Sequence, residues 1–106
     1  MDKKKYIEYL LRNCYRLKEE FSKDEQDRGI CLVNFLDKDE ERDLIKDITI
    51  AINFYESLDI IKREIMILRF LKSKLIKEVA EITNYSESNI KLVLTDCKNK
   101  FLEMLE

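Results

Sequence analysis

Hydrophobic positions recur every three to four residues along most of the chain, which is the spacing of amphipathic helices. The first apolar stripe, in residues 3–21, consists of Ile7, Leu10, Leu11, Cys14, Leu17 and Phe21. The second, over about 40–57, consists of Leu44, Ile45, Ile48, Ala51, Ile52 and Tyr55. The third, over 60–71, places Ile61, Ile65, Leu68 and Leu71 on one side. Each stripe predicts a helix with one buried face.

Two further helices are predicted on either side of Asn84-Tyr85-Ser86. The short one directs Ile76, Val79, Ala80 and Ile82 inward. The long one runs from Ser86 nearly to the C-terminus and buries Ile90, Leu94, Cys97, Phe101 and Leu105. Its opposite, outward side then carries Ser88, Lys91, Leu92, Thr95 and Asn99.

The residues between these two helices predict a tight turn. Asn84 stands where the short helix must end with a positive φ, a conformation that asparagine tolerates best among the residues other than glycine. Tyr85 is expected to point back toward the core, and the Ser86 hydroxyl to cap the amides of the next helix. Ala80 is small enough for a close helix crossing.

The connecting segments show where the other helices begin and end. Residues 22–29 are charged and end in the only glycine, which predicts a linker or an exposed loop. The apolar run 30–36 fits either a short helix or a buried extended connector. Asp37 or Asp39 can cap the second helix and Asp59 the third, and residues 72–74 interrupt the pattern.

Composition supports an all-α fold in one small domain. The 106 residues contain no proline and one glycine, so the turns that join β-strands are almost absent. Residues 1–57 carry 11 Lys/Arg against 14 Asp/Glu, a net charge of −3, and residues 58–106 carry 9 against 8, a net charge of +1. The expected organisation is an N-terminal helical segment, 1–57, that packs or self-associates, followed by a helix–turn–helix unit, 58–106.

Several functional classes find no support in the composition. With no histidine and no glycine-rich phosphate loop, we expect no enzyme and no cofactor. Cys14, Cys31 and Cys97 are scattered among apolar residues, which favours buried free thiols over disulfides or a metal site. Neither a signal peptide nor a membrane span is indicated, so the expected location is the cytoplasm.

The order of residues in 58–105 resembles region 4 of the sigma-70-type sigma factors of bacterial RNA polymerase. The matching positions are Arg63, Glu64, Leu68, Arg69, Glu78, Ala80, Ser86, Ile90, Lys91 and Leu94. The short layout is similar, more loosely, to region-4-like regulators of phages and other mobile elements. The resemblance implies a transcription regulator whose last helix enters the major groove of promoter DNA, and that binds RNA polymerase subunits as region 4 does.

Carried over position by position, the resemblance assigns two sets of DNA contacts. The base-contacting set is Glu87, Ser88, Asn89, Lys91, Leu92 and Thr95. The phosphate-contacting set is Lys74, Lys77, Lys91, Lys98 and Lys100.

Two positions of the last helix favour a different partner. The family usually has arginines where this chain has Val93 and Asp96, and phosphate affinity scales with the number of cationic contacts. The alternative is a protein-interaction module that binds a partner regulator through Leu92, Val93 and Leu102.

Two charged runs each allow two interpretations. Residues 3–5 form a solvated terminus or a nucleic-acid arm, and residues 37–43 an acidic helix start or a surface for a basic partner.

Overall fold

The computed structural model describes residues 2–23 and 37–106, and these residues form an all-α fold. The helices are α1 (Lys3–Phe21), α2 (Lys38–Ser57), α3 (Ile60–Met66), α4 (Ile76–Thr83) and α5 (Glu87–Leu105), with a π-helical segment, η3 (Ile67–Leu71), directly after α3. The all-α prediction and the helix order are therefore confirmed. The two alternatives for 30–36, most of the predicted linker, and Cys31 lie outside the described residues.

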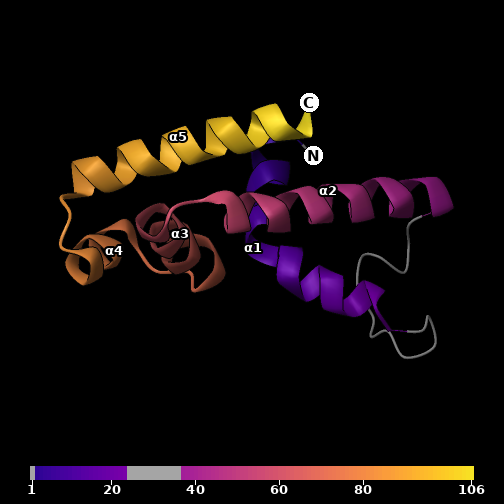
Figure 1. The fold of residues 1–106 in the computed structure, drawn as a ribbon, viewed down its shortest axis with the longest axis horizontal. Helices are drawn as coiled ribbons and strands as arrows, with labels where there is room; N and C mark the ends of the chain where they lie inside the picture. The colour runs from indigo at the N-terminus through magenta and orange to yellow at the C-terminus, as the bar shows by residue number, and fades with distance from the viewer. Residues whose placement is uncertain (1, 24–36) are drawn as a thin grey trace.

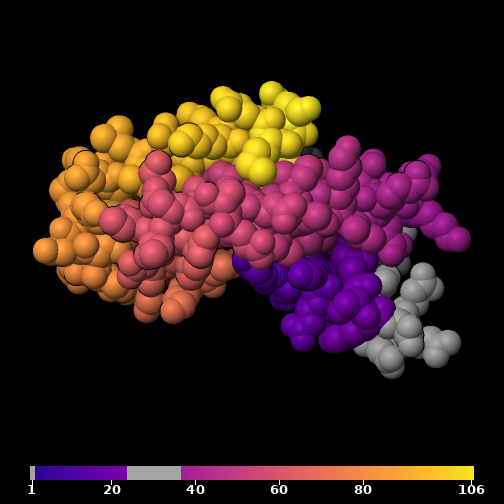
Figure 2. Space-filling view, in the orientation of Figure 1, coloured from indigo at the N-terminus to yellow at the C-terminus, as the bar shows by residue number. Residues whose placement is uncertain are grey.

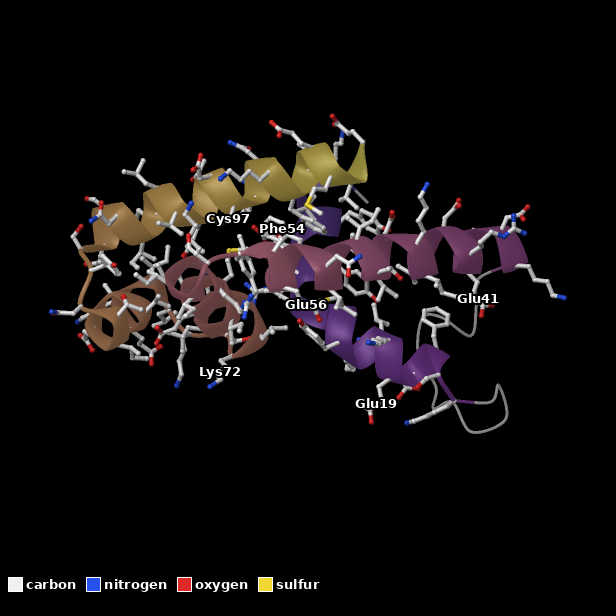
Figure 3. The ribbon with its side chains drawn as sticks, viewed as in Figure 1. Glu19, Glu41, Phe54, Glu56, Lys72 and Cys97 are labelled. Atoms are coloured by element: carbon white, nitrogen blue, oxygen red, sulfur yellow. The ribbon has the colours of Figure 1, made fainter. Side chains whose placement is uncertain are left out.

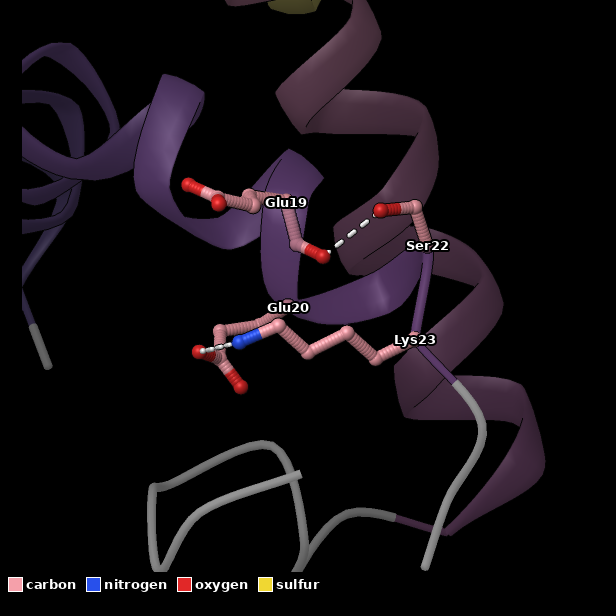
Figure 4. Close-up of polar contacts among 4 residues, drawn as sticks. All are labelled: Glu19, Glu20, Ser22 and Lys23. Carbon is pink, nitrogen blue, oxygen red and sulfur yellow. Dashed lines mark hydrogen bonds and ion pairs between the residues drawn. The ribbon is translucent and has the colours of Figure 1, made fainter. Parts of the chain in front are cut away.

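Short-range hydrogen bonds fix both ends of α1. The Asp2 carboxylate accepts a hydrogen bond from the Lys5 amide at 2.9 Å, which satisfies one of the free donors of the first turn. At the other end the Ser22 hydroxyl donates to the Glu19 carbonyl at 2.7 Å (Figure 4). The helix thus ends where the predicted linker begins.

Aspartates cap α2 and α3. Asp37, rather than Asp39, is the cap of α2: its carboxylate accepts from the Glu40 amide at 2.8 Å, and the Glu40 carboxylate accepts from the Asp37 amide at 3.3 Å. Asp59 caps α3 through the amide of Lys62, as predicted. Asp39 lies in the first turn of α2, where its charge complements the helix dipole.

One hydrophobic core joins the N-terminal helices to the helix–turn–helix. In Figure 1, α1 crosses behind α2, so that its start lies beside the C-terminal end of α5 and its end lies on the other side of α2; Lys3 of α1 pairs with Glu106. The Phe54 and Phe101 rings bring α2 against α5, with centroids 5.2 Å apart, and the Tyr55 hydroxyl donates to the Leu11 carbonyl of α1 at 2.7 Å. Figure 3 shows Phe54 and Cys97 between α2 and α5. Cys14 and Cys97 are free and buried, which confirms the prediction for these two.

The helix predicted over 60–71 is not a uniform α-helix. After Met66 the chain widens into η3, where the Lys72 amide donates to the Ile67 carbonyl at 2.9 Å, a bond five residues long. Because this turn holds more residues than an α-turn, the following side chains fall on a different side than the 3.6-residue period predicts. Leu71, which was predicted to face inward, is only half-buried, whereas Phe70, which was not in the predicted stripe, is buried.

Four inward assignments are wrong. Ile45, Ile61 and Ile82 are 41%, 48% and 52% exposed, and Tyr85 is 39% exposed. Ile45 borders a groove between α1 and α2, while Ile61 and Tyr85 border a groove of about 290 Å³ between α3 and α5. Ile82 lies on α4, whose main neighbours among the described elements are α5 and η3, so its other side faces solvent. Periodicity located the stripes but not the neighbours that cover them.

Among the described helices, none has a stretch long and apolar enough to cross a membrane.

Candidate nucleic-acid interface

The turn between α4 and α5 has the predicted geometry. Asn84 adopts a left-handed conformation, φ 62° and ψ 27°, and ends α4. Ser86 is extended, and its hydroxyl oxygen accepts a hydrogen bond from the Asn89 amide at 3.1 Å. The predictions for Asn84 and Ser86 are confirmed, whereas Tyr85 is exposed instead of pointing toward the core, and these three residues redirect the chain from α4 into α5.

Two charged side chains hold the approach to α4. The Arg69 guanidinium donates to the Lys74 carbonyl at 2.8 Å, closing the loop in which Ser73 has a φ of 53°. The Glu78 carboxylate accepts from the Leu75 amide at 3.0 Å and so caps the start of its own helix. Arg69 and Glu78, which belong to the motif, therefore have structural roles in orienting α4.

A third motif residue, Arg63, fixes α3 to the end of α2. Its guanidinium donates to the carbonyls of Tyr55, Glu56 and Leu58 at 3.0, 2.7 and 3.1 Å. The last carbonyls of a helix have no partner within it, so one arginine satisfies several of them at once.

The first half of α5 presents the predicted base-contacting side chains to solvent. Glu87, Ser88, Asn89, Lys91 and Leu92 are all exposed, while Ile90 on the opposite side is fully buried. Leu92 is 68% exposed. Figure 2 shows α4 and the start of α5 at one end of a molecule that measures 45 × 27 × 24 Å.

Thr95 is also exposed but has a different setting, because it lines a groove between α5 and the start of α1. The base-contacting set is therefore split. Asn89 borders the groove between α3 and α5, and Thr95 borders the groove between α1 and α5.

The predicted phosphate-contacting lysines also differ in their exposure and in their partners. Lys77, Lys91 and Lys100 are exposed, and Lys74 is half-buried at the loop that Arg69 closes. Lys98 has a different setting. Its ammonium donates to the Glu8 carboxylate of α1 at 3.1 Å, and its half-buried side chain lines the groove between α5 and the start of α1. Sequence reasoning missed this pair because Glu8 and Lys98 are 90 residues apart.

The alternative, protein-binding set is reduced to one residue. Val93 and Leu102 are half-buried and pack against the core, so the expectation that they are exposed is wrong. Among the predicted protein-contacting residues, only Leu92 is exposed. The acidic side chains Asp96 and Glu103 are exposed on the same helix, which weakens the positive field that a DNA backbone requires.

The candidate interface is thus the start of α5, which carries exposed carboxylate, hydroxyl, amide, ammonium and methyl groups. Within 2–23 and 37–106, no three acidic or cysteine side chains lie close enough together to hold a metal ion.

Comparisons with known proteins assign the chain to no group: no protein-family model, curated protein or solved structure matches it. The functional argument therefore depends on the geometry of α4, the turn and α5.

Proposed function

We propose that this protein is a cytoplasmic, non-catalytic transcription regulator that docks α5 on promoter DNA, and through this docking recruits or positions RNA polymerase. The observation that carries the proposal is the solvent-exposed first half of α5, which follows a capped three-residue turn from α4 and projects from one end of the molecule. In helix-turn-helix proteins, the N-terminal residues of the second helix contact base edges.

The exposed side chains supply the chemistry for such contacts. The Asn89 amide can pair with adenine through two hydrogen bonds, Ser88 is a permissive donor and acceptor, and the Leu92 side chain can meet a thymine methyl group. Lys91 and Lys77 are exposed cations for phosphate oxygens. The resemblance of residues 58–105 to region 4 of sigma factors supports the same assignment, and it includes Lys91 and Ser86.

A salt-titrated binding assay tests the proposal. Duplex promoter fragments are titrated with the wild-type chain and with Lys91→Glu, and the matched control is Lys46→Glu, an exposed charge reversal on α2. We expect affinity to fall steeply with salt, and Lys91→Glu to weaken binding and to reduce the log–log slope by about 0.9, the value for one phosphate contact. A flat salt response, or equal effects of the two variants, would refute DNA docking by α5.

A protein partner is the second candidate, and the exposure of Leu92 next to Asp96 favours it. Burying the Leu92 side chain against a partner removes apolar surface from water, whereas non-specific DNA binding comes from cationic contacts to which a leucine adds nothing. Two assays on the wild type, Leu92→Ser and Lys91→Glu distinguish the candidates: binding to purified core RNA polymerase and binding to duplex promoter DNA. Loss of polymerase binding with Leu92→Ser alone supports the protein partner, and loss of DNA binding with Lys91→Glu supports DNA docking.

A further inference from the structure

The start of α1 and the second half of α5 enclose a groove of about 410 Å³. Its polar lining consists of Lys3, Lys4 and Lys98 with Thr95 and Asn99, and its apolar floor includes Leu102. No carboxylate is among the described residues that line it. The groove therefore combines three ammonium groups with a hydroxyl and an amide, the donor groups that proteins use to bind phosphate oxygens.

Two carboxylates, Glu8 and Glu106, pair with two of the three lining lysines, Lys98 and Lys3. Glu8, just outside it, has a carboxyl pKa below the usual value because it accepts a hydrogen bond from Lys98, and the charges of Arg12 and Lys4 act in the same direction. Arg12 and Lys98 also lie over the Phe70 ring, 5.3 and 5.7 Å from its centroid. Three cations thus surround one carboxylate.

Two of the lysines can be recruited by an incoming anion. Lys4 is exposed and forms no hydrogen bond or ion pair with the described residues. Lys3 pairs with Glu106 at 2.7 Å, but both side chains are more than half exposed, at 66% and 58%. An ion pair this open to solvent contributes little free energy, so a phosphate can displace Glu106 at small cost.

The groove continues the predicted DNA-contacting side of α5. Thr95 lines it, and Lys91 lies one helical turn earlier on the same side of the helix. The packing of α1 against α5 therefore places Lys3 and Lys4 beside the second half of α5, beyond Thr95 toward the C-terminus, where Lys3 pairs with Glu106. The sequence alone left residues 3–5 as either a solvated terminus or a nucleic-acid arm.

We propose that this groove, the α1–α5 groove, binds the phosphate backbone of duplex DNA beside the segment that α5 enters. The inference rests on the proposed function, because the groove binds the same DNA duplex that α5 enters. Lys4 supplies the principal charge, and the Thr95 hydroxyl and Asn99 amide donate to phosphate oxygens. The site provides cationic contacts from a second helix where Val93 and Asp96 provide none on α5.

The test compares the salt dependence of DNA binding in full-length variants that differ in one exposed lysine. Lys4→Gln removes a groove charge, and Lys5→Gln is the matched control, because Lys5 is exposed on the same helical turn but does not line the groove. For Lys4→Gln we expect the slope of log affinity against log salt to fall by about 0.9, so the ratio of wild-type to variant affinity changes about 3.5-fold between roughly 50 and 200 mM salt. Lys5→Gln should leave the slope unchanged.

A third variant predicts the opposite change. Glu8→Gln removes the carboxylate that holds Lys98, so it should release one further cation to the groove and steepen the slope by about 0.9. Thermal unfolding of each variant shows whether the fold is retained.

The outcomes separate this inference from the proposed function. If Lys4→Gln and Lys5→Gln behave alike while Lys91→Glu still weakens binding, the groove proposal is wrong and docking by α5 stands. If Lys4→Gln reduces the slope and Lys91→Glu has no effect, the groove binds the backbone without docking by α5. Binding of the wild type that does not depend on salt overturns both.

Discussion

Asn84 offers the sharpest test of how the sequence builds the helix–turn–helix, because one residue carries the change of chain direction. Its φ of 62° and ψ of 27° lie in the left-handed region. An L-residue in this region places its Cβ too close to the following carbonyl oxygen, at a cost of about 1–2 kcal/mol, which the short polar side chain of asparagine partly offsets. Replacing Asn84 by alanine keeps the Cβ and removes the compensating amide.

We therefore expect Asn84→Ala to lower the free energy of unfolding by about 1 kcal/mol. Asn84→Gly should stay close to the wild type, since glycine relieves the steric cost while gaining entropy in the unfolded chain. With a urea dependence of about 2 kcal/mol per M, the alanine variant shifts the unfolding midpoint by about 0.5 M.

Equilibrium urea unfolding followed by far-UV circular dichroism measures this difference. Ser88→Ala is the control, because Ser88 is exposed in the first turn of α5 and needs no left-handed backbone. If alanine and glycine at position 84 give the same midpoint, the turn does not depend on a left-handed residue and the reasoning fails.

Two further predictions concern the core and its pH dependence. Tyr55→Phe should lower the free energy of unfolding by about 1 kcal/mol, since it deletes the buried hydrogen bond to the Leu11 carbonyl; unchanged stability would show that this bond contributes nothing. Burial raises the pKa of the Cys14 thiol from 9.0 to about 11 and raises that of Cys97, so the folded state retains protons that the unfolded state loses. The contribution of the two buried thiols to the free energy of unfolding should accordingly be fully present below pH 9 and be lost as the pH rises toward 11. The fall should be shallower in the double variant Cys14→Ala/Cys97→Ala. Urea midpoints at a series of pH values measure both.

The sequence by itself determined the features that depend on near neighbours. The helix positions follow from apolar periodicity, and the caps of Asp59 and Ser86 follow from side chains that bond amides three residues away. The left-handed conformation of Asn84 follows from the tight turn that two closely spaced amphipathic helices require. These predictions hold because helix periodicity, capping and turn geometry are local, and few competing arrangements exist over so few residues.

Tertiary structure decided what depends on residues far apart in the chain. The widened turn of η3 is a departure from α-helical geometry that an ideal period does not contain. The exposure of Ile61 and Ile82 depends on which helices lie beside them, and an apolar stripe does not specify its neighbour. The predictions that Ile61 and Ile82 face inward were wrong for that reason.

The candidate site shows the same division. The exposed residues at the start of α5 follow from helical phase, since Ile90 and Leu94 fix the buried side. The pairing of Lys98 with Glu8, and the position of Lys4 next to Thr95, exist only because α1 packs across α5. Such contacts join residues some 90 positions apart, and their geometry is set by the shared core rather than by any local pattern.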